Sequence, residues 1–147
     1  MIAELARGPM EILLIEDNPG DVRLTREALK EARVSNQLHT VDDGVKALEF
    51  LRQQGIYAAM PRPDLVLLDL NLPKMAGLEV LREIKQDRRL KTIPVVVLTT
   101  SQSRDDIAGS YDLHANCYVS KPVDLERFLH VIRSIETFWL ATAKLPS

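Results

Sequence analysis

Four residues with chemically useful side chains each follow a short apolar run in this chain. Two are acids, one carries a hydroxyl and one an amine: Asp17, Asp69, Thr99 and Lys121. Short apolar runs that alternate with amphipathic stretches are typical of parallel strands joined by helices. In such open sheets, ligands bind outside the carboxyl ends of the strands, where the strand order reverses. We therefore expect these four side chains to converge on one site.

The acids of this expected site predict a divalent cation. Glu16 precedes Asp17, so with Asp69 three carboxylates would meet only one cation, Lys121. At about 4 Å, each pair of carboxylates costs roughly 4 kcal/mol at an effective dielectric constant near 20. Oxygen ligands without Cys or His favour a hard ion, and Mg²⁺ is held through one or two carboxylates, waters and phosphate oxygens. We expect Asp17 and Asp69 to bind Mg²⁺ directly and Glu16 to act through water.

A carboxylate beside Mg²⁺, a hydroxyl and an ammonium group can accept a phosphoryl group. Asp69 could attack phosphorus and become an aspartyl phosphate. Mg²⁺ and Lys121 would stabilise charge on the transferring oxygens, and the Thr99 hydroxyl could bond to the product. A single Asp after a strand is ordinarily a turn residue or a helix cap, so the prediction depends on all four strand ends together.

The elements that must position these residues form five repeats of strand and helix. The strands are expected at 11–15, 37–41, 65–69, 93–98 and 117–119. Signals for the start of a helix lie at 18–21, 43–44, 77, 103–106 and 124. The alternation predicts an α/β fold of the flavodoxin-like (βα)5 type, a doubly wound parallel sheet with strand order 2-1-3-4-5.

Three details of the helices follow from local patterns. The first helix is expected to run to about Arg33, and the second to carry Val45, Leu48 and Leu51 on its apolar side. The dense basic cluster at 88–91 is interpreted as the last turn of a helix, where cations suit the helix dipole.

Composition bounds the class of protein. With 147 residues, 46% of them apolar, the chain fits one folded domain. A net charge of −2 offers no basic field for nucleic acid, and no apolar run approaches the roughly 18 residues of a membrane span. We expect neither a nucleic acid nor a membrane as partner. The one cysteine, Cys117, cannot form an internal disulfide, which predicts a cytoplasmic protein.

Four stretches together resemble the receiver domains of bacterial two-component response regulators. They are 12–18, 67–73, 97–101 and 118–122. The resemblance implies that Asp69 accepts phosphate from a sensor histidine kinase. It also implies that Asp17 and the backbone carbonyl of Asn71 bind Mg²⁺, and that Lys121 contacts the phosphoryl group.

The same resemblance implies a conformational switch. Thr99 and Tyr118 would form the switch pair, and the signal would reach a downstream phosphotransfer or effector protein by phosphorylation-controlled contact. The chain departs from the family at Thr100, where a small alanine is usual, which bears on the lifetime of the phosphate. The expected protein is a signalling phosphoacceptor and not an enzyme.

The resemblance divides the chain into an N-terminal extension (1–9), a receiver domain (10–136) and a C-terminal tail (137–147), with no output domain. The tail and the spacer at 57–61 resemble stand-alone regulators that pair with bacterial phytochrome kinases.

The last helix predicts a homodimer. An apolar stripe is already provided by Leu125, Phe128, Leu129, Ile132 and Ile135. Four residues go beyond this stripe: Val131, Phe138, Trp139 and Leu140. Surplus aromatic residues of this kind favour an interface. We expect Phe138 and Trp139 to anchor a homodimer whose strength depends on phosphorylation of Asp69.

Three alternatives share parts of this pattern. A haloacid-dehalogenase-like phosphatase would want a second acid two residues after Asp69, where this chain has Asn71. A flavodoxin-like flavin carrier needs a first loop that embraces phosphate, which Glu16 and Asp17 would repel. A receiver-like binding module that is never phosphorylated is disfavoured by the complete site. Phosphate incorporation from acetyl phosphate without turnover would separate these classes.

Overall fold

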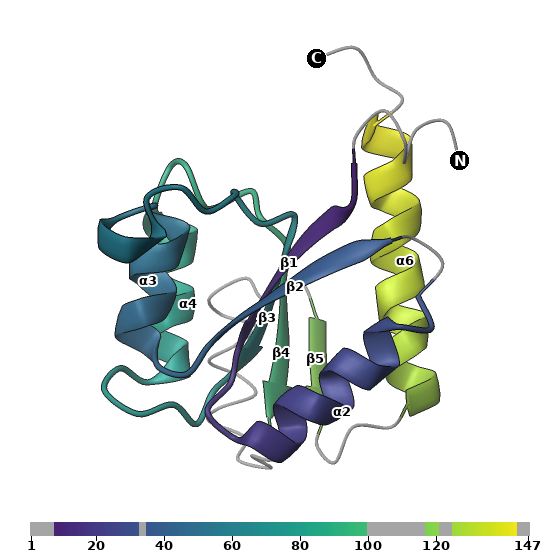
Figure 1. The fold of residues 1–147 in the computed structure, drawn as a ribbon, viewed down its shortest axis with the longest axis horizontal. Coiled ribbons are helices and arrows are strands. Elements are labelled where there is room, and N and C mark those ends of the chain that lie inside the picture. Colours follow the sequence, from purple (N-terminus) through teal and green to yellow (C-terminus); the bar gives the residue numbers. More distant parts are fainter. Residues whose placement is uncertain (1–7, 33–34, 100–116, 121–124, 144–147) are drawn as a thin grey trace.

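The chain forms a five-stranded parallel sheet between two layers of helices. The computed structural model describes residues 8–32, 35–99, 117–120 and 125–143. The strand order is β2-β1-β3-β4-β5, which confirms the predicted order. Helices α3 and α4 cover one face of the sheet, while α2 and α6 cover the other (Figure 1).

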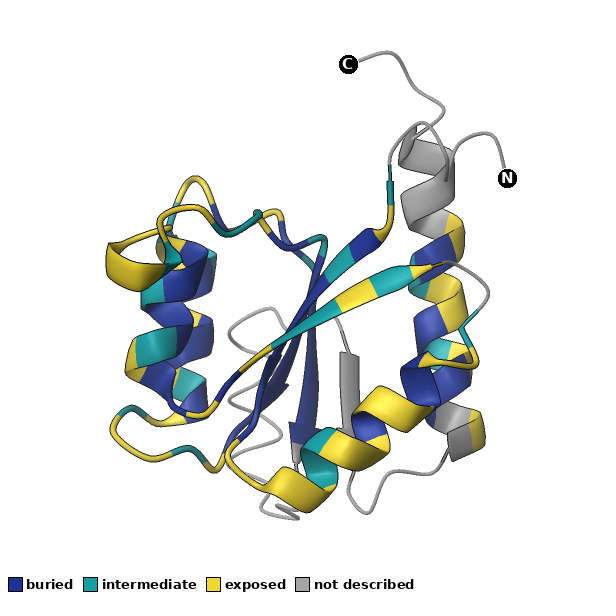
Figure 2. Ribbon diagram, viewed as in Figure 1, coloured by how far each residue is buried: buried dark blue, intermediate teal, exposed yellow. Residues whose placement is uncertain are grey.

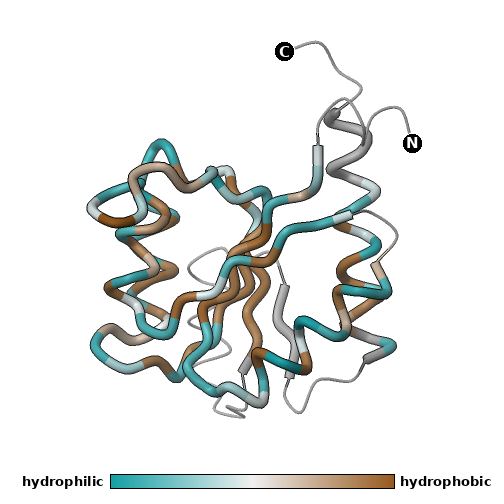
Figure 3. The backbone as a smooth tube through the Cα atoms, viewed as in Figure 1, coloured by the Kyte–Doolittle hydropathy of each residue, from teal (hydrophilic) through white to brown (hydrophobic). Residues whose placement is uncertain are grey.

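The strands bring the predicted polar residues to one edge of the sheet. Their bounds are β1 Met10–Ile15, β2 Asn36–Val41, β3 Leu65–Asp69, β4 Val95–Thr99 and β5 Cys117–Ser120. Ile15 pairs with Val41 on one side and with Leu68 on the other, and Asp69 pairs with Leu98. All residues of β3 are buried, and the central strands are the most apolar part of the backbone (Figure 3).

Each face of the sheet packs against its own pair of helices. The helices are α2 Pro19–Leu29, α3 Gly44–Leu51, the short 3₁₀ helix η1 Gly55–Tyr57, α4 Gly77–Gln86 and α6 Leu125–Ala143. Phe50 and Leu81 belong to the core under α3 and α4, whereas Phe128 and Ile132 belong to the core under α2 and α6. The buried positions of the helices accordingly face the sheet (Figure 2).

Helix α2 is shorter than the sequence predicted. It begins as expected, because the Asn18 side chain accepts a hydrogen bond from the Asp21 N–H at 3.1 Å. It ends at Leu29 instead of near Arg33. The Leu29 carbonyl accepts from a backbone N–H of the following turn at 3.1 Å and from the side-chain amide of Asn36 at 3.2 Å, so a tight turn and a residue of β2 replace the next helical hydrogen bond.

Two further expectations about the helices are wrong. Val45 is 40% exposed, and α3 instead buries Ala47 and Phe50 together with the expected Leu48 and Leu51. The basic cluster at 88–91 lies in turns beyond the end of α4 at Gln86 and is not the last turn of a helix. The Asp87 carboxylate accepts from the Arg89 N–H at 2.8 Å, a local bond that competes with continuation of the helix.

The last helix is longer than its apolar stripe required. Helix α6 continues to Ala143, so residue 137, where the tail was expected to begin, lies within it. Val131 is not surplus, because it packs against the core formed with α2.

The helix expected after Ser103 and the cap expected at Asp124 lie outside the described residues. Among those described, no helix has the length and apolar character that a membrane span requires.

Candidate functional site

Three carboxylates meet where β1 and β3 end. One oxygen from each of Glu16, Asp17 and Asp69 lies within 4.8 Å of the other two. Glu16 and Asp69 are buried, whereas Asp17 is exposed and faces solvent at the mouth of the cluster. Such a set of oxygen donors suits a hard divalent cation, which would also neutralise their mutual repulsion.

The turn after β1 fixes the Glu16 carboxylate. Its Oε1 accepts a hydrogen bond from the Asn18 N–H at 3.1 Å, and its own N–H donates to the Val41 carbonyl at 3.0 Å. Asn18 in turn caps α2. The carboxylate is therefore held at the junction of β1, β2 and the first turn of α2.

The Asp69 carboxylate is oriented by the loop that follows β3. Its Oδ1 accepts from the Asn71 N–H at 3.1 Å. The Gly77 N–H donates to the Leu70 carbonyl at 3.0 Å, which brings the start of α4 against the end of β3. A Cβ atom at position 77 would lie 2.4 Å from the Leu70 Cα and 2.5 Å from the Asp69 carbonyl oxygen, so glycine permits this approach.

The loop between β3 and α4 is also tied to α3. Asp43 is buried and caps α3 by accepting from the Lys46 N–H at 2.7 Å. Its second oxygen lies 3.6 Å from the Lys74 ammonium nitrogen, on the loop. A Cβ atom on Gly44 would lie 2.6 Å from the Met75 carbonyl oxygen. In the sequence, 43–44 signalled only the start of a helix, because the contacts of these residues with Lys74 and Met75 are long-range.

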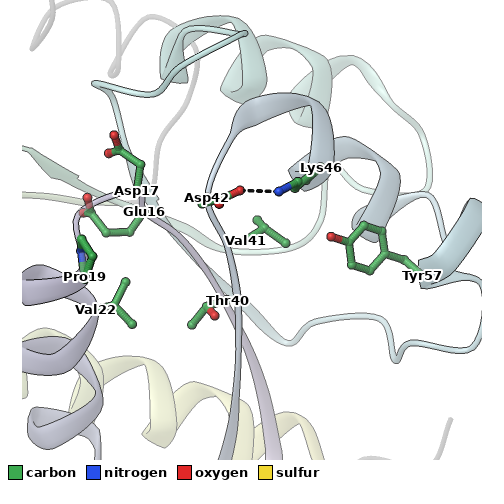
Figure 4. Close-up of a pocket in the computed structure, with 9 residues that line it drawn as sticks. All are labelled: Glu16, Asp17, Pro19, Val22, Thr40, Val41, Asp42, Lys46 and Tyr57. Atoms are coloured by element: carbon green, nitrogen blue, oxygen red, sulfur yellow. Dashed lines mark hydrogen bonds and ion pairs between the residues drawn. The ribbon is translucent and has the colours of Figure 1, made fainter.

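A cavity of about 400 Å³ opens beside the acidic cluster (Figure 4). It passes over the carboxyl end of β2 and reaches Tyr57 of η1. Its lining consists of Glu16, Asp17, Pro19, Val22, Thr40, Val41, Asp42, Lys46 and Tyr57. Asp42 and Lys46 form an ion pair at 2.8 Å, and this hydrogen bond lowers the pKa of Asp42 and raises that of Lys46.

The other predicted site residues are described in part or not at all. Thr99 ends β4 one residue beyond Leu98, the partner of Asp69, and Tyr118 of β5 pairs with Val97. The side chains of Thr99 and Tyr118, like the whole of Lys121, lie outside the described residues. Phe138 and Trp139 belong to α6, but their side chains are not described either.

The fold and the acidic site together define a class of protein. Residues 12–133 match the family model of the response regulator receiver domain. The chain belongs to this family and is a signalling protein of two-component systems. Receiver domains bind a divalent metal at this acidic cluster. This assignment replaces the phosphatase and flavin-carrier alternatives.

Individual relatives are similar over nearly the whole chain. Response regulator Rcp1 of Synechocystis sp. is 52% identical over 139 residues, which cover 95% of each protein. The crystal structure of the phosphorylated cyanobacterial phytochrome response regulator RcpA matches with a TM-score of 0.80 and 54% identity, covering 95% of this chain and 100% of that one. The Mn²⁺-bound form of Rcp1 matches with a TM-score of 0.79 and 52% identity, at the same coverage.

Proposed function

We propose that Asp69 is the phosphoacceptor of this response regulator. A carboxylate oxygen of Asp69 attacks the phosphorus of a phosphohistidine on a sensor histidine kinase. The phosphorus–nitrogen bond breaks, a phosphorus–oxygen bond forms, and the histidine leaves with the electron pair. The observation that carries the proposal is the placement of Asp69: it ends the fully buried strand β3 with Glu16 and Asp17 beside it. The hydrogen bond from the Asn71 N–H holds the carboxylate in one orientation before transfer.

We propose Mg²⁺ as the cation of the acidic cluster. Asp17, Asp69 and the backbone carbonyl of Asn71 would hold it directly, and Glu16 would hold it through water. When bound, Mg²⁺ supplies positive charge between the carboxylates and the incoming phosphoryl oxygens. The buried, hydrogen-bonded Glu16 keeps the negative charge that attracts the cation in a fixed place. Lys121 would contact the phosphoryl group from the end of β5.

We propose that Thr99 and Tyr118 transmit the phosphorylated state. A phosphoryl group on Asp69 offers acceptor oxygens to the Thr99 hydroxyl, which would draw the end of β4 inward and open space for the Tyr118 ring. The pairing of β4 with β5 supports this route, because Thr99 lies opposite Ser120. A Thr99→Ala variant should accept phosphate normally yet bind its phosphorylation-dependent partner as the unphosphorylated protein does.

We propose a phytochrome-like histidine kinase as the donor and a cytoplasmic phosphotransfer or effector protein as the receiver of the signal. The names of the relatives support the first, since RcpA is called a phytochrome response regulator.

We also propose a homodimer anchored by Phe138 and Trp139, and the continuation of α6 to Ala143 supports this. Sedimentation of the wild type and of a Phe138→Ala, Trp139→Ala double variant, each in the phosphorylated and the unphosphorylated form, tests the dimer. Monomers in all four samples would exclude the dimer.

Transfer from the phosphorylated kinase tests the acceptor. Asp69→Asn should abolish labelling, and excess chelator should stop labelling of the wild type. Asp42→Asn is the matched control, because Asp42 lies in the neighbouring cavity but outside the acidic cluster. This control should be labelled like the wild type. Undiminished labelling of Asp69→Asn would disprove the assignment of the acceptor.

A further inference from the structure

A second cavity, of about 250 Å³, lies where α3 and α4 end. Helix α3 starts directly after the carboxyl end of β2, so its last residues reach the opposite edge of the sheet from the acidic cluster (Figure 1). The cavity is bordered by the end of α3, the segment before β3 and the turn after α4. Its lining consists of Leu51, Arg52, Gln53, Gln54, Arg62, Asp87, Arg89 and Leu90.

Three arginines from separate segments converge on this cavity. Arg52, Arg62 and Arg89 share the lining with a single carboxylate, Asp87, so the lining carries two net positive charges. Glu83 lies outside the lining and forms an ion pair with Arg52 at 3.1 Å. When Glu83 is counted with the lining residues, one net positive charge remains. The basic cluster at 88–91 thus contributes to a cavity and does not cap a helix.

Two of these guanidinium groups are not neutralised by an acid within the described part of the chain. Arg62 Nη2 donates to the Arg89 carbonyl at 3.1 Å and to the Thr92 hydroxyl at 3.0 Å, and both acceptors are uncharged. Among the residues that the structure describes, ion pairs to the lining arginines involve only Arg52, with Glu83 and with Asp87 at 3.6 Å. Arg62 is therefore held in position by neutral acceptors and keeps its charge for a ligand.

We propose that this cavity binds a small phosphate ligand, as the free ion or as a phosphate monoester. Guanidinium groups present several N–H donors in a plane, a geometry that matches phosphate oxygens. The volume lies just below the usual range for ligand pockets, which favours a ligand of few atoms. The buried Leu51 and Leu90 give the cavity an apolar floor that an organic group next to the phosphate would cover.

Amide chemical shifts of the ¹⁵N-labelled protein test the proposal. Inorganic phosphate and glycerol phosphate are titrated separately, with chelator present so that the acidic cluster holds no cation. Both should shift the amides of Gln53 and Leu90, with Glu16 and Asp69 unmoved. If glycerol phosphate binds more tightly than inorganic phosphate, its organic group covers the apolar floor and the ligand is a phosphate monoester. If the two bind with equal affinity, the site binds free phosphate. Shifts confined to Glu16 and Asp69, or no shifts, would overturn the proposal.

Substitutions identify the groups that bind. Arg62→Gln and Arg89→Gln should each weaken binding about tenfold, because each removes charged donors. Since Arg62 also holds the turn after α4, Arg89→Gln keeps the test valid if Arg62→Gln is unstable. Arg26→Gln, which removes an exposed arginine of α2, is the matched control and should change affinity less than about twofold. Equal affinities in wild type and Arg89→Gln would refute the site.

Discussion

Removing the charge of Asp69 should stabilise the protein when no divalent cation is present. The oxygens of Glu16, Asp17 and Asp69 lie within 4.8 Å of one another. At that distance a pair of like charges costs about 3.5 kcal/mol at an effective dielectric constant near 20. Asp17 is exposed and its share is screened, so the buried pair Glu16 and Asp69 carries most of the repulsion, and Lys121, the cation expected at this site, would offset part of it. Asp69→Asn should therefore raise the free energy of unfolding by about 1–3 kcal/mol.

Urea unfolding with and without Mg²⁺ measures this effect. In chelator the Asp69→Asn variant should have the higher midpoint, with an unchanged slope. Added Mg²⁺ should stabilise the wild type by RT ln(1 + [Mg²⁺]/Kd), about 2.7 kcal/mol at one hundred times Kd. The variant, which lacks one carboxylate ligand, should gain much less, so the difference between the two proteins should shrink or reverse.

Asp42→Asn serves as the control for loss of an acid in general. Asp42 is exposed and pairs with Lys46 at 2.8 Å, so removing its charge should leave stability unchanged or slightly lower in both conditions. A metal-free Asp69→Asn variant that is no more stable than the wild type would contradict the predicted repulsion, and so would equal stabilisation of both proteins by Mg²⁺.

Three further predictions concern the loop behind the acceptor and the end of α4. Gly77→Ala should lower the free energy of unfolding by about 1–3 kcal/mol, since its Cβ atom would lie 2.4 Å from the backbone of Leu70; an unchanged thermal midpoint would contradict this. Asp43→Ala removes the cap of α3 and should cost about 0.5–2 kcal/mol in urea unfolding, a loss that Asp42→Ala should not reproduce. Burial lowers the pKa of Lys85 in the folded state, so the unfolded chain holds that proton more tightly. The free energy of unfolding should therefore rise with pH between the folded-state pKa of Lys85 and its ordinary value of 10.5. The Lys85→Met variant should lack this part of the rise, and identical pH profiles of wild type and variant would contradict the prediction.

The parts of the site that the sequence predicted are those fixed by strand order alone. Asp17 and Asp69 follow apolar runs, and parallel strands place their carboxyl ends at one edge. The rule that ligands bind at the carboxyl ends of parallel strands thus predicted one site from residues more than fifty positions apart. The contacts behind the acceptor were not predictable in this way, because the approach of Gly77 to Leu70 depends on how α4 packs.

Predictions about the helices were wrong where they used the spacing of residues in the sequence alone. Val45, Leu48 and Leu51 are three residues apart, and each such step turns 300° around a helix, so Val45 and Leu51 point about 120° apart. The core took the face that also carries Ala47 and Phe50, which left Val45 exposed. The basic cluster at 88–91 was misjudged because the local hydrogen bond of Asp87 ends α4 early.

The convergence of the arginines was invisible in the sequence. Arg52, Arg62 and Arg89 come from a helix end, a connecting segment and a turn, and no period relates them. The packing of α3 beside α4, together with the hydrogen bonds from Arg62 to the turn after α4, brings these positions around one cavity.

Chemical mapping of the phosphorylated residue tests the central claim most directly. The protein is phosphorylated with acetyl phosphate and Mg²⁺, reduced with borohydride, and analysed by mass spectrometry of its peptides. Borohydride converts an aspartyl phosphate into homoserine, so the account predicts homoserine at position 69 and at no other acid. Conversion at Asp17 or at another acid, or a phosphate that stays on the Asp69→Asn variant, would contradict it.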